Sequence, residues 1–260
     1  MLSLTSVQIS AFIGTFWWPF CRIMGAFIVM PFLSSSYIPP MVRVLLAVLI
    51  SALLSPMLPP VPAVDAISIG ALFLAIEQLL IGFMLALFTY ILIHVMTLFG
   101  AMMSMQMGLA MAIMNDPANG SSNPILSQWF LLYGTLLFLA LDGHLVAIGI
   151  IVDSFRLWPI GTGIFDLPLM GLVGRFAWLF ASAFMLAIPA ILAMLMVNLT
   201  FGVLSRAAPS LNVFALGFPM SMLMGLLCVF FSFSGLPSRY SDLCLEALSA
   251  MYQFIGGSHE

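Results

Sequence analysis

An apolar run over residues 66–100 sets the first constraint on the fold. Glu77 is the one acidic or basic side chain in that run, histidine aside. As a helix, the run would extend about 50 Å at ~1.5 Å per residue, which exceeds the ~30 Å hydrocarbon core of a bilayer. Such a helix must tilt steeply, break, or lie partly outside lipid.

The composition of the whole chain points the same way. Hydrophobic residues make up 63% of the 260 residues and charged residues 6%, whereas soluble domains carry about 25% charged residues. The chain therefore cannot cover itself with polar surface. Its apolar runs are continuous, whereas the strands of an outer-membrane barrel alternate apolar and polar residues. We predict an all-α, integral membrane-type fold of helical hairpins with kinked and broken helices, in a bacterial inner membrane.

The charged residues and cysteines exclude several kinds of protein. The chain has no lysine and its six arginines are spread along it, so it has no basic patch for nucleic acid. The cysteines Cys21, Cys228 and Cys244 lack CxxC pairing, which favours small buried residues over a disulfide framework or a zinc site. The N-terminal 21 residues lack a basic region and a cleavage motif, so we expect a retained first helix.

Turn signals divide the chain into apolar segments. The Pro39-Pro40 pair forces a turn, and Asp142-Gly143-His144 interrupts the fourth segment, which predicts a hairpin or two half-length pieces. Residues 153–170 are interpreted as a connector, and the tail after residue 235 contains a candidate amphipathic helix. The segments themselves cover about 7–33, 41–58, 66–100, 125–152, 171–204 and 213–234.

Residues 100–124 combine methionines, small residues and a polar loop. Gly100, Ser104, Gly108 and Ala112 recur at every fourth position, so on a helix they form a smooth ridge that another backbone can approach. A deformable, sulfur-rich surface beside a polar loop suits a constriction that must seal and move. The alternative is a packing helix padded with methionine. The methionines of the stretch are Met102, Met103, Met105, Met107, Met111 and Met114.

Charged residues in or beside the apolar runs are candidates for functional sites. A charge at bilayer depth costs about 2.5–3.5 kcal/mol on insertion scales. The structural alternative for Glu77 is that it pairs with an arginine and fixes helix packing or subunit register. Asp142 and His144 face different directions on a helix and have no further ligand nearby. The candidates are Arg22, Glu77, Asp142, His144 and Arg175.

We find no GxSxG, HExxH or Walker motif, and we predict no enzymatic activity and no cofactor. The main rival to a constriction is a small-solute or metal transporter. Clustered thioethers suit Cu(I), but no cysteine or histidine accompanies these methionines. Broken helices fit a transporter, whereas convincing charge pairs are missing.

Several short motifs occur in an order that points to one family. They are Arg22-Ile-Met-Gly25, Pro31, Pro39 with Arg43, Glu77 with Gly82-Phe83, Gln106-Met-Gly108, Asp116-Pro117, Leu141-Asp-Gly-His144 with Asp153-Ser-Phe155, and Arg206-Ala-Ala-Pro209-Ser-Leu-Asn212-Val-Phe-Ala-Leu-Gly217-Phe-Pro219. In this order and spacing they resemble the FliR family, the single-copy component of the bacterial flagellar type III export gate. Ser210 stands where the family commonly has Gln, which puts in doubt any contact that depends on the longer amide.

The resemblance implies a partner set and a domain organisation. FliR-like proteins assemble with FliP-like and FliQ-like subunits, joined by an FlhB-like export switch protein. The resulting closed gate passes unfolded export substrates. The resemblance also implies one gate domain over residues 1–260, with a FliP-like part to about residue 170 and a FliQ-like part over 171–260.

These expectations assign residues to two roles. Glu77, Arg206 and Asn212 are expected to make polar contacts between subunits. The expected location is the flagellar basal body in the inner membrane, in contact with lipid. The homologous gate subunit of a virulence injectisome is an alternative with the same mechanism, which the Asp142-Gly-His144 and Asn212-Val-Phe motifs disfavour. The expected constriction and plug comprise Gly100, Met102, Met103, Ser104, Met105, Gln106, Met107, Gly108, Met111, Met114, Asn115, Asp116 and Pro117.

Overall fold

The computed structural model describes residues 6–34, 38–59, 62, 64, 68–109, 124–165, 167–207 and 213–256, with the backbone alone for 6–13 and 213–216. Helices hold 88% of the described residues, and none of those residues lies in a strand. The predicted all-α fold is therefore confirmed.

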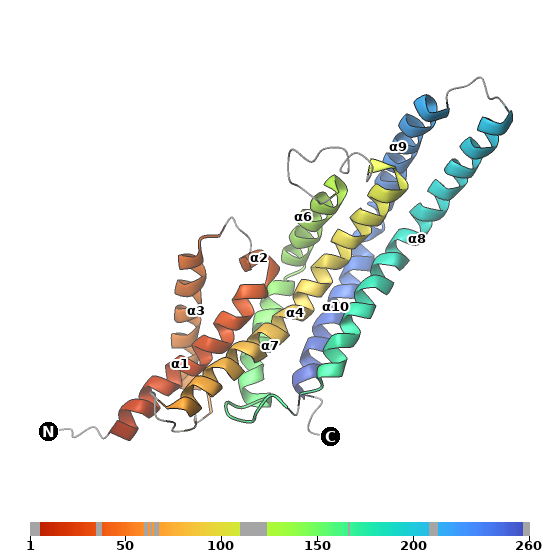
Figure 1. Cartoon of the computed structure of the whole chain (residues 1–260). Helices are drawn as coiled ribbons and strands as arrows, with labels where there is room; N and C mark the ends of the chain where they lie inside the picture. The colour runs from red at the N-terminus through yellow and green to blue at the C-terminus, as the bar shows by residue number, and fades with distance from the viewer. Residues whose placement is uncertain are drawn as a thin grey trace. The chain divides into compact units, whose positions relative to one another are not determined.

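Figure 1 shows the helices in chain order. They are α1 (Ser6–Val29), α2 (Pro31–Ser34), α3 (Pro40–Leu54), the 3-10 turn η1 (Ser55–Met57), α4 (Ile69–Gln106), α6 (Ile125–Ala140), α7 (Gly143–Leu157), α8 (Leu169–Ala207), α9 (Val213–Ser232) and α10 (Leu236–Gly256).

Prolines set several of the helix boundaries. Pro40 opens α3, where its missing N–H removes no helical hydrogen bond. A proline also sets the end of α7. The predicted start of the connector at residue 153 was wrong, because α7 continues to Leu157 and the chain leaves the helix at Trp158, directly before Pro159. A residue that precedes proline is pushed out of helical geometry, and no earlier residue of that segment is a helix breaker.

The lengths of the helices fit a membrane-type protein. Pro40–Met57, Ile69–Gln106 and Leu169–Ala207 are long and apolar enough to cross a membrane. Two further membrane spans are possible if each of two bent helix pairs is counted as a single span. The pair α6 and α7 is bent by 69°, and the pair formed by Gly217–Ser232 and α10 is bent by 63°. The predicted break at Asp142-Gly143 is confirmed.

The chain packs as two units. The first comprises Met1–Ile91, Asp142–Arg175 and Glu246–Glu260. Within it, α1 packs against α3 and α2, as Figure 1 shows. Hydrogen bonds from Arg22 of α1 reach Gln78 of α4 and Ser154 of α7. This unit therefore joins segments that lie far apart in the sequence.

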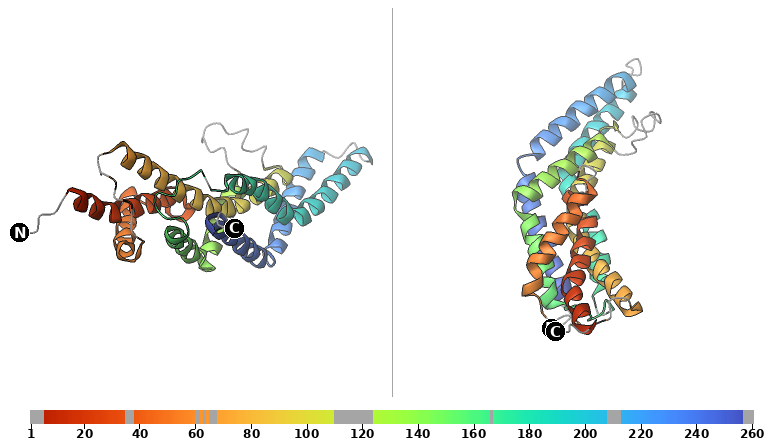
Figure 2. Two further views of the ribbon diagram at one scale, coloured as in Figure 1. Left: turned by 90° about the horizontal axis from the view of Figure 1, so that it is seen from below. Right: turned by 90° about the vertical axis from the view of Figure 1, so that its left-hand side faces the viewer.

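The second unit comprises Leu92–Leu141 and Phe176–Leu245. It contains the end of α4, α6, most of α8, α9 and the start of α10. Figures 1 and 2 agree in placing α9 beside the second half of α8, with the two helices running in opposite directions. The predicted helical hairpins therefore include this pair. The division of the chain near residue 170 stays a prediction.

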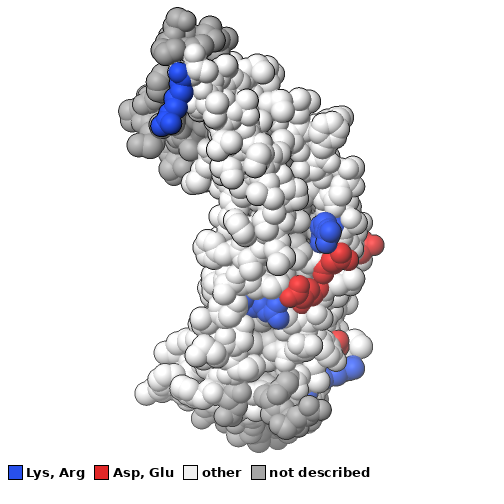
Figure 3. All heavy atoms as spheres, turned by 90° about the vertical axis from the view of Figure 1, so that its right-hand side faces the viewer, with Lys and Arg blue, Asp and Glu red and all other residues white. Residues whose placement is uncertain are grey.

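The surface of the second unit is unusually apolar. Large side chains on α8 and α9 are exposed, among them Phe180, Phe184, Phe230 and Phe231. Figure 3 shows one face of the molecule on which charged side chains are few and most of the surface carries none. Such surface requires lipid or another apolar protein as its neighbour.

Candidate functional site

The end of α4 lies within the methionine-rich stretch. The Met107 amide donates to the Met103 carbonyl at 3.1 Å, and the Gly108 amide donates to the Met105 carbonyl at 3.1 Å. Gly108 has φ 73°, a left-handed conformation that favours glycine and commonly terminates helices. Gly108 therefore ends α4 instead of continuing the expected ridge of small residues.

The close approach of another helix that the ridge predicts occurs at Gly100, about two helical turns before Gly108. A Cβ atom at Gly100 would lie 2.6 Å from the carbonyl oxygen of Leu126 and 2.9 Å from Cα of Ser127, both on α6. Ser104 follows on the same face and is fully buried. Gly100 thus forms a close contact between α4 and α6, whereas Ala112 lies outside the described residues.

The four described methionines of the stretch divide into two groups. Met103 and Met107 are fully buried, whereas Met105 is 65% exposed and Met102 is half-buried. Met107 packs against α9, where a Cβ atom at Gly225 would lie 2.8 Å from its sulfur. Gln106, beside it, is half-buried. Met111, Met114, Asn115, Asp116 and Pro117 lie outside the described residues.

Glu77 has partners within its own chain. Its Oε1 atom accepts a hydrogen bond of 3.2 Å from Nε2 of Gln78. Arg22 acts on it electrostatically. The sequence singled out Arg22 and Glu77 but missed Gln78. An uncompensated arginine inside an apolar helix was the available signal that a polar partner had to exist.

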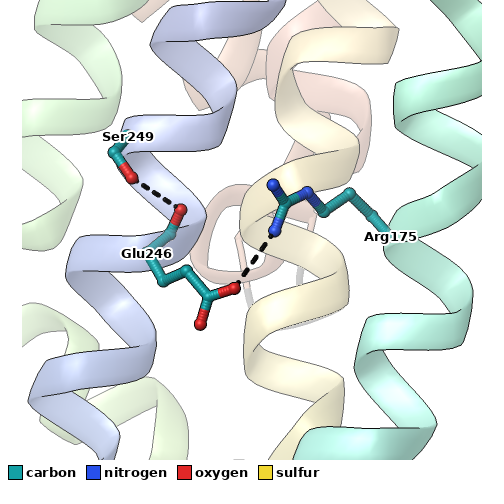
Figure 4. Close-up of polar contacts among 3 residues, drawn as sticks. All are labelled: Arg175, Glu246 and Ser249. Carbon is teal, nitrogen blue, oxygen red and sulfur yellow. Dashed lines mark hydrogen bonds and ion pairs between the residues drawn. The ribbon is translucent and has the colours of Figure 1, made fainter.

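The other charged candidates lie near helix ends. Arg175 of α8 and Glu246 of α10 form an ion pair of 3.5 Å with side chains 24% and 53% exposed, and the Ser249 hydroxyl donates to the Glu246 carbonyl at 2.9 Å (Figure 4). Arg206 is exposed near the end of α8. Asn212 lies outside the described residues.

Asp142 and His144 shape the bend between α6 and α7. Asp142 has φ 55°, and its carbonyl accepts hydrogen bonds from the amides of Leu145 and Val146 at 3.0 Å and 3.3 Å. The His144 ring meets Phe32 edge-on at 6.0 Å between centroids. Within the described ranges, no group of three or more His, Cys, Asp or Glu residues is placed to hold a metal ion.

Comparison with known proteins places this architecture in a family. The family model described as "Bacterial export proteins, family 1" matches residues 13–247. The Flagellar biosynthetic protein FliR of Escherichia coli K12 is 34% identical over 227 residues, which cover 87% of each chain. The chain belongs to the FliR family.

More distant FliR relatives cover nearly all of the chain. The Flagellar biosynthetic protein FliR of Buchnera aphidicola subsp. Schizaphis graminum is 30% identical over 253 residues, which cover 97% of this chain and 98% of the relative. The protein of the same name from Bacillus subtilis is 24% identical over 250 residues, covering 92% and 95%. The resemblance predicted from the short motifs is confirmed.

Two of the FliR-like motifs meet at one helix contact. A Cβ atom at Gly25 of α1 would overlap the carbonyl oxygen of Leu79, and one at Gly82 of α4 would overlap the carbonyl oxygen of Arg22. The two helices therefore touch through main-chain atoms. Ser154, from the third motif, accepts two hydrogen bonds from Arg22 at the same junction.

Proposed function

We propose that residues 100–117 form the constriction and plug of a flagellar protein export gate of which this chain is one subunit. The exposed Met105 and the half-buried Met102 would lie at the constriction. Gly108 would act as the point where helix gives way to plug. The plug residues from Asn115 to Pro117 lie outside the described residues, and their role rests on the family position that they match.

The chain is a membrane-embedded component of the flagellar export apparatus and works with other subunits of that apparatus. For the specific partners we propose FliP-like and FliQ-like gate subunits, an FlhB-like switch protein and unfolded export substrates. We place the assembly in the inner membrane. The proposed subunit is non-enzymatic, so the energy for export must come from other components.

The observation that carries the constriction is the division of the methionines. Met103 and Met107 fill the packed core, whereas the 65% exposed Met105 has no core to fill. Thioether side chains are flexible and repack readily, which suits a seal around changing contents. The helix terminus at Gly108 follows this outward surface directly.

The exposed surface of α8 supports apolar protein partners. Within the second unit, exposed apolar side chains extend from Phe176 to Leu204 along this helix. That stretch is about 42 Å long at ~1.5 Å per residue, compared with ~30 Å of bilayer hydrocarbon. An upright helix of this length extends beyond the hydrocarbon, so we expect neighbouring helices on part of its length.

Polar contacts and domain organisation complete the proposal. Arg206, exposed near the end of α8, and Asn212 are proposed contacts between subunits, and the half-buried Glu77 would contribute the exposed part of its side chain. We retain the division into a FliP-like part to about residue 170 and a FliQ-like part over 171–260 as part of this proposal.

The test uses the assembled export complex in planar bilayers. Deletion of residues 115–123, and separately Met102→Ala/Met105→Ala, should each raise the conductance for small ions. Met170→Ala removes a methionine that is exposed elsewhere, at the start of α8, and serves as the control with unchanged conductance.

Co-purification in mild detergent tests the gate assembly separately from the constriction. Recovery of partner subunits together with unchanged conductance in both variants would reject the constriction while keeping the gate subunit. A lone homodimer would reject the gate assembly itself.

A further inference from the structure

Arg22 is a fully buried cation in a chain with few charges. Its Nε atom donates to Oε1 of Gln78 at 2.8 Å, and its Nη1 atom donates to the carbonyl and hydroxyl oxygens of Ser154 at 2.9 Å and 3.0 Å. The guanidinium carbon lies 4.4 Å from the ring centroid of Phe155. These partners are all neutral, so they orient the guanidinium without balancing its charge.

Two observations show that these neutral partners compensate the charge of Arg22 only in part. The Nη2 atom of Arg22 is buried and has no hydrogen-bond partner among the described residues. Among the described residues, Arg22 and Glu77 also form no direct ion pair, although their opposite charges attract each other. A buried cation requires a counter-charge, and the Glu77 carboxylate is the one that acts on Arg22.

Gln78 connects the two charges. Its Oε1 atom accepts from Arg22 while its Nε2 atom donates to Glu77 at 3.2 Å. Both hydrogen bonds require the same orientation of the amide group. Because a charged partner stands on each side, each of these hydrogen bonds is strengthened.

The relay also reaches the connector that follows α7. Ser154, which accepts from Arg22, lies in the last turn of α7, and the connector is closed by the Gly163 carbonyl, which accepts the indole N–H of Trp158 at 3.0 Å. Gly163 has φ 91°, which favours glycine. Ile160 of the same connector packs against the apolar cluster of Trp18, Ala71 and Leu74.

We propose that Glu77 is the counter-ion of the buried Arg22, that Gln78 transmits their interaction, and that this relay, through Ser154, fastens the end of α7 and the 158–165 connector after it to α4. Gln78 is then a positioning residue. Removing the charge from Glu77 weakens the compensation of Arg22 and, through Arg22, the hold on Ser154. The proposal is independent of the gate function.

Limited digestion by chymotrypsin of the full chain in its purified export complex tests the relay. Phe165 is 95% exposed in the connector and is the reporter cleavage site. Glu77→Gln keeps the shape of the side chain and removes its charge, and Gln78→Met removes the bridging amide. Each should raise the rate of cleavage after Phe165 by about fivefold or more, because cleavage follows the population of the released connector.

A double variant distinguishes this relay from a general loss of stability. In an Arg22→Met background, Glu77→Gln should cause no further increase, since the counter-charge has lost its partner. Rates that multiply in the double variant would overturn the proposal. If Arg22→Met does not assemble, the same comparison is made with Gln78→Met and Glu77→Gln.

Glu246→Gln supplies the matched control, because it removes another partly exposed carboxylate of the same unit. This variant should cleave at the parental rate. An increase equal to that of Glu77→Gln would also overturn the proposal.

Discussion

The side chain of Met107 occupies the space that a side chain at Gly225 would require. A Cβ atom at Gly225 would overlap Cγ of Met107 and lie 2.8 Å from its sulfur. Met107, the residue directly after α4, thus packs against a glycine of α9 within the second unit. This contact accounts for the full burial of Met107, in contrast to the exposed Met105 two positions earlier.

Gly225→Ala should destabilise the chain by about 1–3 kcal/mol, the usual cost of overpacking. The clash involves Cγ of Met107, close to the main chain, so rotation of the flexible end of that side chain cannot relieve it. The measurement is the thermal unfolding midpoint of the detergent-solubilised complex. Gly225→Ala/Met107→Ala should recover part of the loss, and a double variant as unstable as the sum of the singles would contradict the contact.

Gly82→Ala should be among the most damaging glycine substitutions, with a loss of about 3 kcal/mol or more. The obstacle is the backbone carbonyl of Arg22, and a main-chain atom cannot move aside without displacing α1. Membrane-inserted yield and unfolding midpoint are the measurements.

Gly171→Ala is the matched control for that substitution. Apart from its chain neighbours and the backbone of its own helix, no atom of the described residues lies within 4 Å of the added Cβ atom at this position of α8. Alanine should be neutral or gain about 0.5–1 kcal/mol there, since glycine is unfavourable inside a helix. Equal losses at Gly82 and Gly171 would argue against a main-chain contact between α1 and α4.

Asp142→Gly should preserve export, because the described role of Asp142 is a left-handed turn at φ 55°. Glycine enters that conformation without the roughly 1–2 kcal/mol penalty of other residues. Asp142→Val should lower stability and export, since a β-branched residue is poorly accommodated at positive φ. Swimming on soft agar and secretion of flagellar proteins give the readout. Loss of export in the glycine variant would reveal a chemical role for the carboxylate.

Arg175 and Glu246 illustrate a weak polar contact. Their ion pair is partly exposed, so Glu246→Gln should reduce stability by less than about 1 kcal/mol. The difference between parent and variant should shrink further as salt is added. Unfolding midpoints at low and high ionic strength measure this. A large loss that is insensitive to salt would show that the carboxylate is needed for something besides this pair.

Local signals predicted most of the helices. The break at Asp142-Gly143 and the turn before Pro40 follow from residues that act on their immediate neighbours, and both occur where expected. The end of α7 was placed too early because a few polar residues, including Asp153 and Arg156, were taken for a connector. A helix tolerates polar residues on one face, whereas it does not continue through the residue before Pro159.

For the methionine-rich stretch, the sequence did not predict which methionines are buried and which are exposed. Its small residues and sulfur content are visible in the sequence, but Met107 becomes a core residue because Gly225 of α9 leaves room for it. Likewise, Gly108 fits both a continuing ridge and a helix terminus when only the sequence spacing is considered. Tertiary neighbours decide between the two.

The relay at Arg22 has a consequence for how the chain is made. Arg22 and its acceptor Gln78 are separated by 56 residues, and Ser154 follows Arg22 by 132. The ribosome therefore releases α1, with its cation, well before either acceptor has been synthesised. Arg22 can therefore form its hydrogen bond to Gln78 only after α4 has been synthesised, and those to Ser154 only after α7 has been synthesised. The order of synthesis thus sets the earliest point at which the junction of these helices can close.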